Sequence, residues 1–285
     1  MSILYLVATP IGNLGDLSPR AREVLSSVDF LAAEDTRVSQ KLLNACGLPK
    51  KPMISYYEHN RRARGEEVLA RLRAGESCAL VTDAGTPAVS DPGEDLVALC
   101  AAEGVPVVPV PGCCAAVCGL AVSGLPTGRW CFEGFLSVNK KARREHLDAL
   151  AGEKRTMIFY EAPHKLCATL RDLAEAFGAD RRVSLSRELT KLHEETLRMT
   201  LGEASAYFDE HPPRGEFVLT VAGAPEEPST EQDEADRLAA AAEAVRRRIE
   251  AGQTQKDAVK AVSAETGVKK NALYRFVLEQ DEENI

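Results

Sequence analysis

One acidic stretch of the sequence consists otherwise mainly of small residues, glycine and proline. VTDAGTPAVSDPGED, residues 81–95, follows an apolar run and precedes the helical pattern LVALCAAEG. It carries Asp83 and Asp91 but neither lysine nor arginine, at a strand-to-helix turn of the kind that binds ligands in α/β proteins. Carboxylates beside closely approaching backbone repel phosphate and suit hydroxyl groups, ammonium groups or a cationic centre. The stretch therefore predicts a neutral or positively charged ligand.

Two further strand ends have the same uncharged or acidic character. PGCCAA, residues 111–116, combines a tight turn with small side chains, and IFYEAP brings Glu161 to the end of another predicted strand. Glycine and small side chains let the backbone approach a ligand closely. Each stretch alone is equally consistent with an ordinary turn. Together they predict a cleft for a nucleoside-sized molecule, and S-adenosylmethionine, a sulfonium that carries an amino acid and a ribose, fits this description.

Missing motifs exclude several common ligand sites. The chain contains neither the phosphate-binding GxxxxGK[ST] nor a GxGxxG after its first predicted strand. TDAGT has some likeness to the DxDxT of aspartyl phosphatases, but Gly85 occupies the place of their second acid. The eight cysteines form no CxxC pair and the five histidines are scattered singly, so we expect buried, reduced thiols and no metal site.

The elements that must position these turns alternate between strand and helix in the first part of the chain. Apolar runs at residues 3–9, 29–35, 53–58, 78–83 and 105–110 are separated by amphipathic helical patterns, the first of which has Ser18 as N-cap and Pro19 at its first position. A small-residue helix at 112–124 closes the unit. Apolar strands of this kind indicate a parallel sheet covered on both faces. We predict an N-terminal α/β domain over residues 1–119.

The pattern changes from about residue 120. Strand candidates at 182–189, 195–201 and 216–223 include two that follow each other without an intervening helix, which indicates a mixed sheet. We predict a second α/β domain over residues 120–225 that completes the cleft, and an acidic, breaker-rich linker over 226–236. Residues 237–285 form a helical tail. Two short helices broken by TG are equally consistent with a helix-turn-helix-like module that binds RNA or the ribosome and with a small helical cap.

The charge and hydropathy of the chain indicate whether it binds nucleic acid or a membrane. The formal net charge of −8 gives no support to nucleic-acid binding over the whole surface, although basic residues cluster locally, as in RRAR at 61–64. The N-terminal residues lack the features of a signal peptide, and no apolar run approaches the ~18 residues of a membrane span. We expect a cytoplasmic protein that makes no membrane contact.

Specific motifs carry a family resemblance over nearly all of the first 223 residues. In chain order these motifs include LYLVATPIGNLGD, AEDTR, ISYYEHN, LVTDAGTPAVSDPG, VPVPG, FEGFL, FYEAPHK, SRELTKLHEE and GEFVLTVAG. The chain resembles the tetrapyrrole methylase family, and within it the members that act on ribosomal RNA. The resemblance implies S-adenosylmethionine-dependent 2′-O-methylation of a cytidine ribose in the decoding region of 16S rRNA, in the small ribosomal subunit. It also implies a homodimer of chains with two α/β domains and the cofactor between them.

The resemblance also transfers the cofactor-binding residues. Most belong to the first turn, the acidic turn and the turn after VPVPG, and the others come from strands of the second domain. Cys114 puts a thiol where the family often has a hydroxyl, so one hydrogen bond to the cofactor is in doubt. The implied residues are Pro10, Thr82, Asp83, Ala84, Gly85, Thr86, Val89, Cys114, Ala115, Glu161, Leu189 and Ala222.

Methyl transfer to a ribose hydroxyl needs alignment of the nucleophile and removal of its proton. The candidate bases are Glu34 and Asp35 in AEDTR and Glu188, Lys191 and Glu194 in RELTKLHEE, of which Glu34, Asp35 and Lys191 come first. Each carboxylate is also consistent with an ion pair inside its own motif. The candidate RNA-binding residues are Arg37, Arg61, Arg62, Arg187, Lys269 and Lys270. Two other functions stay open. The chain could methylate a tetrapyrrole or a protein side chain, or it could bind the ribosome through a fold with a vestigial cofactor site.

Overall fold

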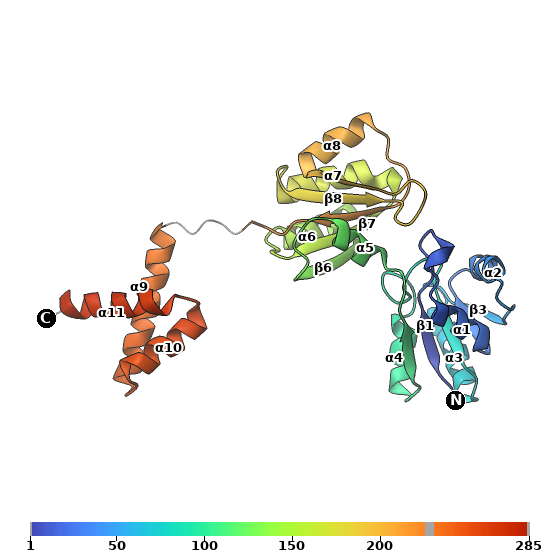
Figure 1. Ribbon diagram of the computed structural model, residues 1–285, viewed down its shortest axis with the longest axis horizontal. Helices are drawn as coiled ribbons and strands as arrows, with labels where there is room; N and C mark the ends of the chain where they lie inside the picture. The colour runs from blue at the N-terminus through green and yellow to red at the C-terminus, as the bar shows by residue number, and fades with distance from the viewer. Residues whose placement is uncertain (1, 226–230, 284–285) are drawn as a thin grey trace. The chain divides into compact units, whose positions relative to one another are not determined.

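The computed structural model describes residues 2–225 and 231–283. It consists of two compact units, Met1–Ala224 and Pro225–Ile285. Two separate sheets with their helices make up the first unit, and the second unit consists of helices alone in the part of the chain that is described (Figure 1).

The first sheet is entirely parallel, with strand order β3-β2-β4-β1-β5. Parallel strands with helices on both faces are buried on both sides, which accounts for their continuous apolar sequences. The strands are β1 (Leu4–Val7), β2 (Phe30–Ala33), β3 (Met53–Ser55), β4 (Cys78–Val81) and β5 (Val107–Val110).

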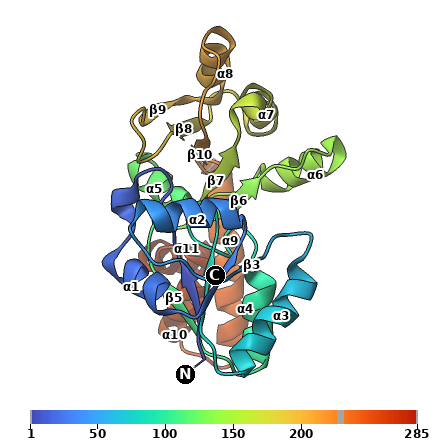
Figure 2. The same ribbon diagram turned by 90° about the vertical axis from the view of Figure 1, so that its right-hand side faces the viewer.

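Helices cover both faces of this sheet. Helices α1 (Pro19–Ser27) and α2 (Thr36–Ala45) pack on one face, and α3 (Arg61–Arg73) and α4 (Glu94–Ala102) pack on the other (Figure 2). The predicted start of α1 is confirmed, because the Ser18 side chain accepts a hydrogen bond from the Ala21 amide and Pro19 is the first helical residue. A short 3₁₀ helix, Leu14–Asp16, lies in the turn after β1.

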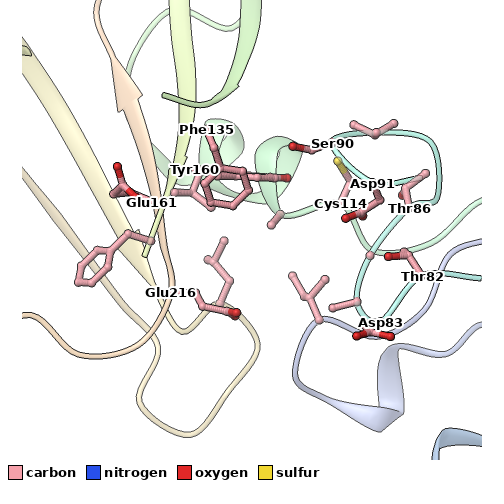
Figure 3. Close-up of a pocket in the computed structure, with 18 of the residues that line it drawn as sticks. Thr82, Asp83, Thr86, Ser90, Asp91, Cys114, Phe135, Tyr160, Glu161 and Glu216 are labelled. Atoms are coloured by element: carbon pink, nitrogen blue, oxygen red, sulfur yellow. The ribbon is translucent and has the colours of Figure 1, made fainter. Parts of the chain in front are cut away.

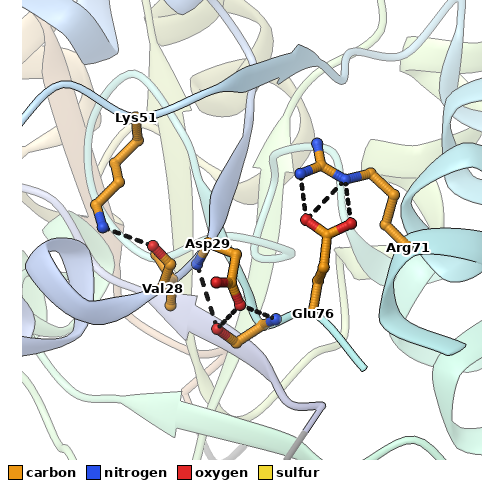
Figure 4. Close-up of polar contacts among 6 residues, drawn as sticks. Val28, Asp29, Lys51, Arg71 and Glu76 are labelled. Atoms are coloured by element: carbon orange, nitrogen blue, oxygen red, sulfur yellow. Dashed lines mark hydrogen bonds and ion pairs between the residues drawn. The ribbon is translucent and has the colours of Figure 1, made fainter. Parts of the chain in front are cut away.

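Polar contacts close the end of the first sheet at which β2 and β4 begin. The Asp29 carboxylate accepts hydrogen bonds of 2.7 Å from both the amide and the hydroxyl of Ser77, and these bonds lower its pKa (Figure 4). Arg71 pairs with Glu76, and its guanidinium lies 3.7 Å from the centroid of the Phe30 ring. The turns that follow the strands lie at the opposite end of the sheet, where the strands end.

The second sheet is mixed, with strand order β6-β7-β10-β8-β9. Only β6 and β7 are parallel, and the remaining pairs are antiparallel. The predicted fold class, a parallel sheet followed by a mixed one, is confirmed. The strands are β6 (Trp130–Phe135), β7 (Thr156–Glu161), β8 (Arg182–Arg187), β9 (Glu195–Thr200) and β10 (Phe217–Val221).

Helices also cover both faces of the second sheet. One face packs against α6 (Lys140–Leu150), α7 (Pro163–Phe177) and α8 (Leu201–Glu210), and the other packs against α5 (Ala115–Val122). A Cβ atom on Gly119 of α5 would lie 2.7 Å from Val218 Cγ1, so this glycine allows the helix to approach β10 closely. The helix expected to close the first domain therefore packs on the second sheet. The boundary at 119/120 stays a prediction.

The second unit has a small apolar core of its own. Its helices are α9 (Glu231–Glu250), α10 (Gln255–Thr266) and α11 (Lys270–Glu283), and buried alanine, valine and leucine side chains from all of them meet. Thr254 caps α10, and Gly267, with φ of 74°, ends it in the left-handed conformation. Residues 226–230 of the predicted linker lie outside the described residues, and its last residues belong to α9.

The cysteines depart in part from expectation. All eight are free thiols, but only Cys78 and Cys100 are buried. The other six, which lie in turns, on helices and, for Cys131, in β6, remain partly open to solvent. In the described residues, no helix is both long and apolar enough to cross a membrane.

Candidate functional site

A cavity of ≈ 330 Å³ lies where the carboxyl ends of strands from both sheets meet. The first sheet contributes the turns after β1, β2, β4 and β5, and the second sheet contributes the ends of β6, β7 and β8 and the start of the antiparallel β10. Figure 3 shows side chains from both sheets lining this cavity. The carboxyl ends of parallel strands are the usual place for ligands in α/β folds.

The acidic turn is tied to the turns on either side of it. The Thr9 amide donates to the Gly85 carbonyl at 2.8 Å, and the Gly85 amide returns a hydrogen bond of 3.1 Å to the Thr9 carbonyl. The Thr86 hydroxyl donates to the Cys113 carbonyl at 2.8 Å. Gly85 has φ of 90°, a conformation that favours glycine. Three turns that are distant in sequence therefore form one rigid wall of the cavity.

Three carboxylates line the cavity beside this wall, Glu34 from the turn after β2 and Asp83 and Asp91 from the turn after β4. Glu34 Oε2 accepts hydrogen bonds from the Thr82 hydroxyl at 2.6 Å and from the Asp83 amide at 3.3 Å, while Asp83 Oδ1 accepts one from the Asp35 amide at 3.1 Å. Burial, together with the negative charge of Glu34, raises the pKa of Asp83 and raises that of Asp91 to about 6. The mutual repulsion of these groups makes the wall a favourable environment for a cation.

Among the described residues, Lys191 is the only lysine or arginine that lines the cavity, and two carboxylates pair with it. Its Nζ lies 2.9 Å from Glu188 Oε1 and 3.2 Å from Glu216 Oε2. These partners outweigh the opposing effect of burial and raise the pKa of Lys191, so the amine is protonated at neutral pH. A protonated amine cannot accept a proton, so Lys191 is a poor candidate for the general base at that pH.

The second sheet supplies an aromatic wall. Phe135 is 57% exposed, and its ring centroid lies 5.5 Å from that of Tyr160. The Tyr160 hydroxyl accepts a hydrogen bond of 2.9 Å from the Ala116 amide in the first turn of α5, and burial raises the pKa of Tyr160 to about 12. The exposed Phe135 ring is a surface on which a flat heteroaromatic group can stack.

Most of the predicted cofactor residues line this one cavity. They are Thr82, Asp83, Ala84, Gly85, Thr86, Val89, Cys114, Ala115, Glu161 and Leu189.

Two predicted cofactor residues do not line the cavity, and a third has its carboxylate engaged by the protein. Pro10 precedes the lining residue Ile11, and Ala222 follows β10, whose opposite end forms the cavity wall. Ala222 therefore lies away from this cavity, because the antiparallel direction of β10 carries it to the other end of the strand, and its role in cofactor binding stays a prediction. Glu161 is 3% exposed, and its carboxylate accepts hydrogen bonds from the Ala162 amide and the Thr169 hydroxyl.

The remaining catalytic and RNA candidates are partly paired with one another. Asp35 caps α2 by accepting from the Arg37 amide at 2.8 Å, and it pairs with the Arg37 guanidinium at 2.6 Å. The Arg37 side chain, the largest cause, lowers the pKa of Asp35 to about 2, which makes that carboxylate a weak base. Arg187 pairs with Glu195 at 2.6 Å. Of the predicted bases, only Glu34 lines the cavity without being paired to a cation.

The other predicted RNA-binding residues lie on exposed surfaces. Arg61 and Arg62 occupy the first turn of α3. Lys269 and Lys270 are exposed at the start of α11, in the second unit.

Sequence reasoning identified Asp91 as part of the acidic stretch, but it did not identify Ser90, Phe135, Tyr160 or Glu216 as lining residues. Signals existed for two of them, because Phe135 and Tyr160 stand near the ends of the strands within FEGF and FYE. The position of Glu216 depends on the antiparallel pairing of β10, which its own sequence does not specify.

The lining fits S-adenosylmethionine by its charge and size. Glu34, Asp83 and Asp91 suit a sulfonium and an ammonium group, and Ala84, Gly85, Cys114 and Ala115 leave room at the backbone. Cys114 provides no side-chain hydrogen bond at the N-cap of α5, so it leaves amides of the first turn for other partners. Among the described residues, no group of three or more His, Cys, Asp or Glu side chains is arranged to hold a metal ion.

Comparison with known proteins agrees with this architecture. The family model of the tetrapyrrole (corrin/porphyrin) methylases matches residues 3–205. The chain is 49% identical over 282 residues to ribosomal RNA small subunit methyltransferase I of Synechocystis sp., covering 98% of each protein. It is 44% identical over 280 residues to the protein of the same name from Escherichia coli O157:H7, covering 97% of this chain and 95% of that protein.

A solved structure supports the fold at lower sequence similarity. Uroporphyrin-III C-methyltransferase from Thermus thermophilus, complexed with S-adenosylhomocysteine, is 20% identical, with a TM-score of 0.53, and the match covers 76% of this chain and 97% of that one. The family model spans more than half of the chain, and the two relatives exceed 40% identity over nearly its full length. The chain therefore belongs to the tetrapyrrole methylase family.

Proposed function

We propose that the protein is an S-adenosylmethionine-dependent methyltransferase of small-subunit ribosomal RNA, and that it methylates the 2′-hydroxyl of a cytidine in the decoding region. The observation that carries the proposal is the 49% identity, over almost the whole chain, to a relative named ribosomal RNA small subunit methyltransferase I. The nucleotide and the target atom come from the motif resemblance described above.

The cavity is the site proposed for the methyl donor. When bound, S-adenosylmethionine supplies a methyl group activated by the positive charge on sulfur. The carboxylates of Glu34, Asp83 and Asp91 would balance that charge, and the backbone of Ala84, Gly85 and Ala115 would hold the amino acid part. The Phe135 ring would provide the apolar surface for the adenine.

The chain would bind RNA through its local basic groups. Arg61 and Arg62, next to Tyr57, provide positive charge and an aromatic ring that is 40% exposed. Lys269 and Lys270 offer a second set of cations at the start of α11, and we propose that the second unit contacts the small ribosomal subunit.

Oligomeric state and location complete the proposal. Two apolar side chains of the first unit, Val138 and Leu192, are 80% and 93% exposed, which suits burial between two copies of the chain. A homodimer that works in the cytoplasm is therefore part of the proposed function, and sedimentation of the purified protein tests the dimer.

A tetrapyrrole substrate is the second candidate. The observation in its favour is the fold shared with uroporphyrin-III C-methyltransferase, although at 20% identity that likeness extends only to the fold. A tetrapyrrole is large, rigid and carries many carboxylates, and the acidic wall of this cavity would repel it.

Methyl mapping distinguishes the candidates. Small subunits from cells lacking the protein are incubated with the purified chain and S-adenosylmethionine, and 2′-O-methyl groups are mapped along the rRNA. The proposal predicts one new 2′-O-methyl group, on a cytidine of the decoding region. Methyl transfer to uroporphyrinogen, or to ribosomal proteins, without transfer to rRNA would contradict it.

A further inference from the structure

The surroundings of the methyl-donor cavity differ in charge between the two sheets. On the side of the first sheet it adjoins a second cavity of ≈ 560 Å³. The carboxylates that line this second cavity are Glu34, Glu58, Asp91, Glu94 and Asp95. Arg61 is the only lysine or arginine that lines it in the described residues, and Arg61 pairs with Glu58. Carboxylates repel phosphate, so an RNA strand that reaches the methyl-donor cavity has to approach it from the side of the second sheet.

The end of the second sheet that borders the methyl-donor cavity carries positive charge. Three neighbouring strands, β6, β7 and β10, meet the cavity there, and each is joined to a segment that contains lysine or arginine and no carboxylate. These segments are 136–142 after β6, 162–168 after β7 and 211–215 before β10. Their cations, which we call the basic edge, are Lys140, Lys141, Lys165 and Arg214.

Strand pairing places the three segments side by side. Phe135 near the end of β6 is paired with Tyr160 of β7, and β7 is paired along its length with β10. Neighbouring strands lie ~5 Å apart, so the ends of all three strands fall within ~10 Å. The basic edge is therefore one continuous feature of the sheet, although its residues are distant in sequence.

The first turns of α6 and α7 are also held together. The Arg143 guanidinium donates to the Thr169 hydroxyl at 2.9 Å and pairs with Asp172. Lys140 precedes Arg143 by about one helical turn, and Lys165 precedes Thr169 by about one turn. The two lysines therefore lie at neighbouring helix starts, at the same end of the sheet.

The charges of the basic edge are available to a partner. Lys140 and Arg214 are exposed and Lys165 is half-buried, and none of the three has an ion pair within the described residues. Lys141 lies 3.8 Å from Glu145, in a pair whose side chains are 86% and 66% exposed. Exposed pairs of this kind contribute little, so Lys141 can exchange its partner for a phosphate.

The carboxylates closest in sequence to the basic edge are mostly engaged by the protein. Glu161 is buried and accepts a hydrogen bond from the Thr169 hydroxyl. Glu216 pairs with Lys191 at 3.2 Å, whereas Glu210, at the end of α8, is exposed. The edge therefore keeps an excess of positive charge, on a chain whose formal net charge is −8.

We propose that the basic edge binds the phosphates of the RNA strand next to the target nucleotide, and so directs that nucleotide into the methyl-donor cavity. This inference rests on the proposed function and gives it an RNA-binding surface that neither the motifs nor the comparisons identified. A positively charged track that follows the backbone is typical of proteins that bind single-stranded nucleic acid. The predicted contacts of Arg61 and Arg62 on α3 would then lie further along the RNA.

The first test removes three charges from the basic edge. The full-length variant with Lys140→Ala, Lys165→Ala and Arg214→Ala is compared with the wild type for binding to unmethylated small subunits over a range of salt concentrations. Its affinity should be lower by roughly 3- to 150-fold, the combined effect of three exposed ion pairs. Its salt slope should be smaller by about 2, or roughly 0.7 for each lost contact with a single strand. An unchanged slope would overturn the inference.

The matched control removes three charges from the opposite end of the same sheet. Arg129, Lys154 and Arg182 are exposed at the starts of β6, β7 and β8, and they too lack ion pairs in the part of the chain that is described. Arg129→Ala combined with Lys154→Ala and Arg182→Ala changes the net charge equally and should bind subunits as the wild type does. Equal losses in both triple variants would show that only the net charge matters, which would overturn the basic edge.

Further measurements separate the ways in which the inference can fail. The basic-edge variant should keep wild-type affinity for S-adenosylhomocysteine in calorimetry, because none of its residues lines the methyl-donor cavity. If that variant does not fold, Lys140→Ala alone replaces it and should lower the salt slope by roughly 0.7. Altered sedimentation with unchanged subunit binding would assign the edge to contact between two copies of the chain and overturn the inference.

Methyl transfer distinguishes this inference from the proposed function. Wild-type transfer to rRNA, together with wild-type subunit binding by the basic-edge variant, would overturn the inference and leave the proposed function intact. Absence of wild-type transfer to rRNA would instead overturn the proposed function.

Discussion

Replacement of Gly12 by alanine tests whether the two sheets close on one cavity. Gly12 lies in the turn after β1, and an added Cβ would stand 2.4 Å from Lys191 Cγ and 3.0 Å from Thr190 Oγ1, both on the side of the second sheet. Carbon atoms pack best at ~3.5–4.0 Å, so this contact must open by about 1 Å or more. Because φ of Gly12 is not in the left-handed region, alanine brings a steric change without backbone strain.

The expected magnitude follows from that overlap. Overpacking a close contact typically costs ~1–3 kcal/mol. If the overlap destabilises the form of the protein in which the cavity is closed around the ligand, Gly12→Ala should weaken the binding of S-adenosylhomocysteine by roughly 5- to 150-fold. Removing the Lys191 side chain beyond Cβ relieves the clash, so Gly12→Ala combined with Lys191→Ala should bind about as well as Lys191→Ala alone. The coupling energy between the two sites should reach about 1 kcal/mol or more.

Calorimetric titration of the four proteins completes this mutant cycle. S-adenosylhomocysteine is the appropriate ligand because its sulfur is uncharged, which removes the interaction between a sulfonium and the charge lost with Lys191. Gly128→Ala is the matched control, since an added Cβ there meets nothing within 4 Å. Wild-type affinity of Gly12→Ala, or strictly additive losses in the double variant, would refute the close contact across the cavity.

Three further predictions concern stability, the cofactor turn and RNA. Gly223→Ala would place a Cβ 2.0 Å from the Lys154 carbonyl oxygen, so it should lower the free energy of unfolding by ~3 kcal/mol and reduce Tm by several degrees; an unchanged melting curve would contradict this packing. Cys114→Ser should cap α5 and raise stability by ~0.5–1 kcal/mol in the same melting experiment, whereas a lower Tm would show that the thiol is needed for packing. Arg61→Ala combined with Arg62→Ala should weaken RNA binding and reduce the salt slope by roughly 0.7 for each lost phosphate contact, and an unchanged slope would argue against both contacts.

The architecture was largely predictable because it depends on local patterns. Strands buried on both faces give continuous apolar runs such as CALV of β4, and start signals such as Ser18-Pro19 specify where a helix begins. The placement of α5 was not predictable in the same way. Its small residues suit either sheet, and only the close approach of Gly119 to Val218 shows which sheet it covers.

The acidic part of the site was also predictable, because its residues lie close together in the sequence. The part of the site formed by the second sheet was not predictable. Asp83 and Gly85 are neighbours in one turn, so their chemistry can be inferred together. The partnership of Lys191 with Glu216 requires the register of β10 against β8, and the position of Phe135 follows a bulge between Phe132 and Gly134. These are long-range features of the sheet, which no single segment encodes.

The central claim is that the acidic cavity selects a cationic sulfonium over a phosphate ligand. Calorimetric titration of the purified protein with S-adenosylmethionine, repeated in the presence of excess ATP, tests it most directly. The account predicts one donor site per chain whose affinity is unchanged by ATP, because Glu34, Asp83 and Asp91 repel phosphate. No heat of binding with S-adenosylmethionine, or competitive displacement by ATP, would contradict it.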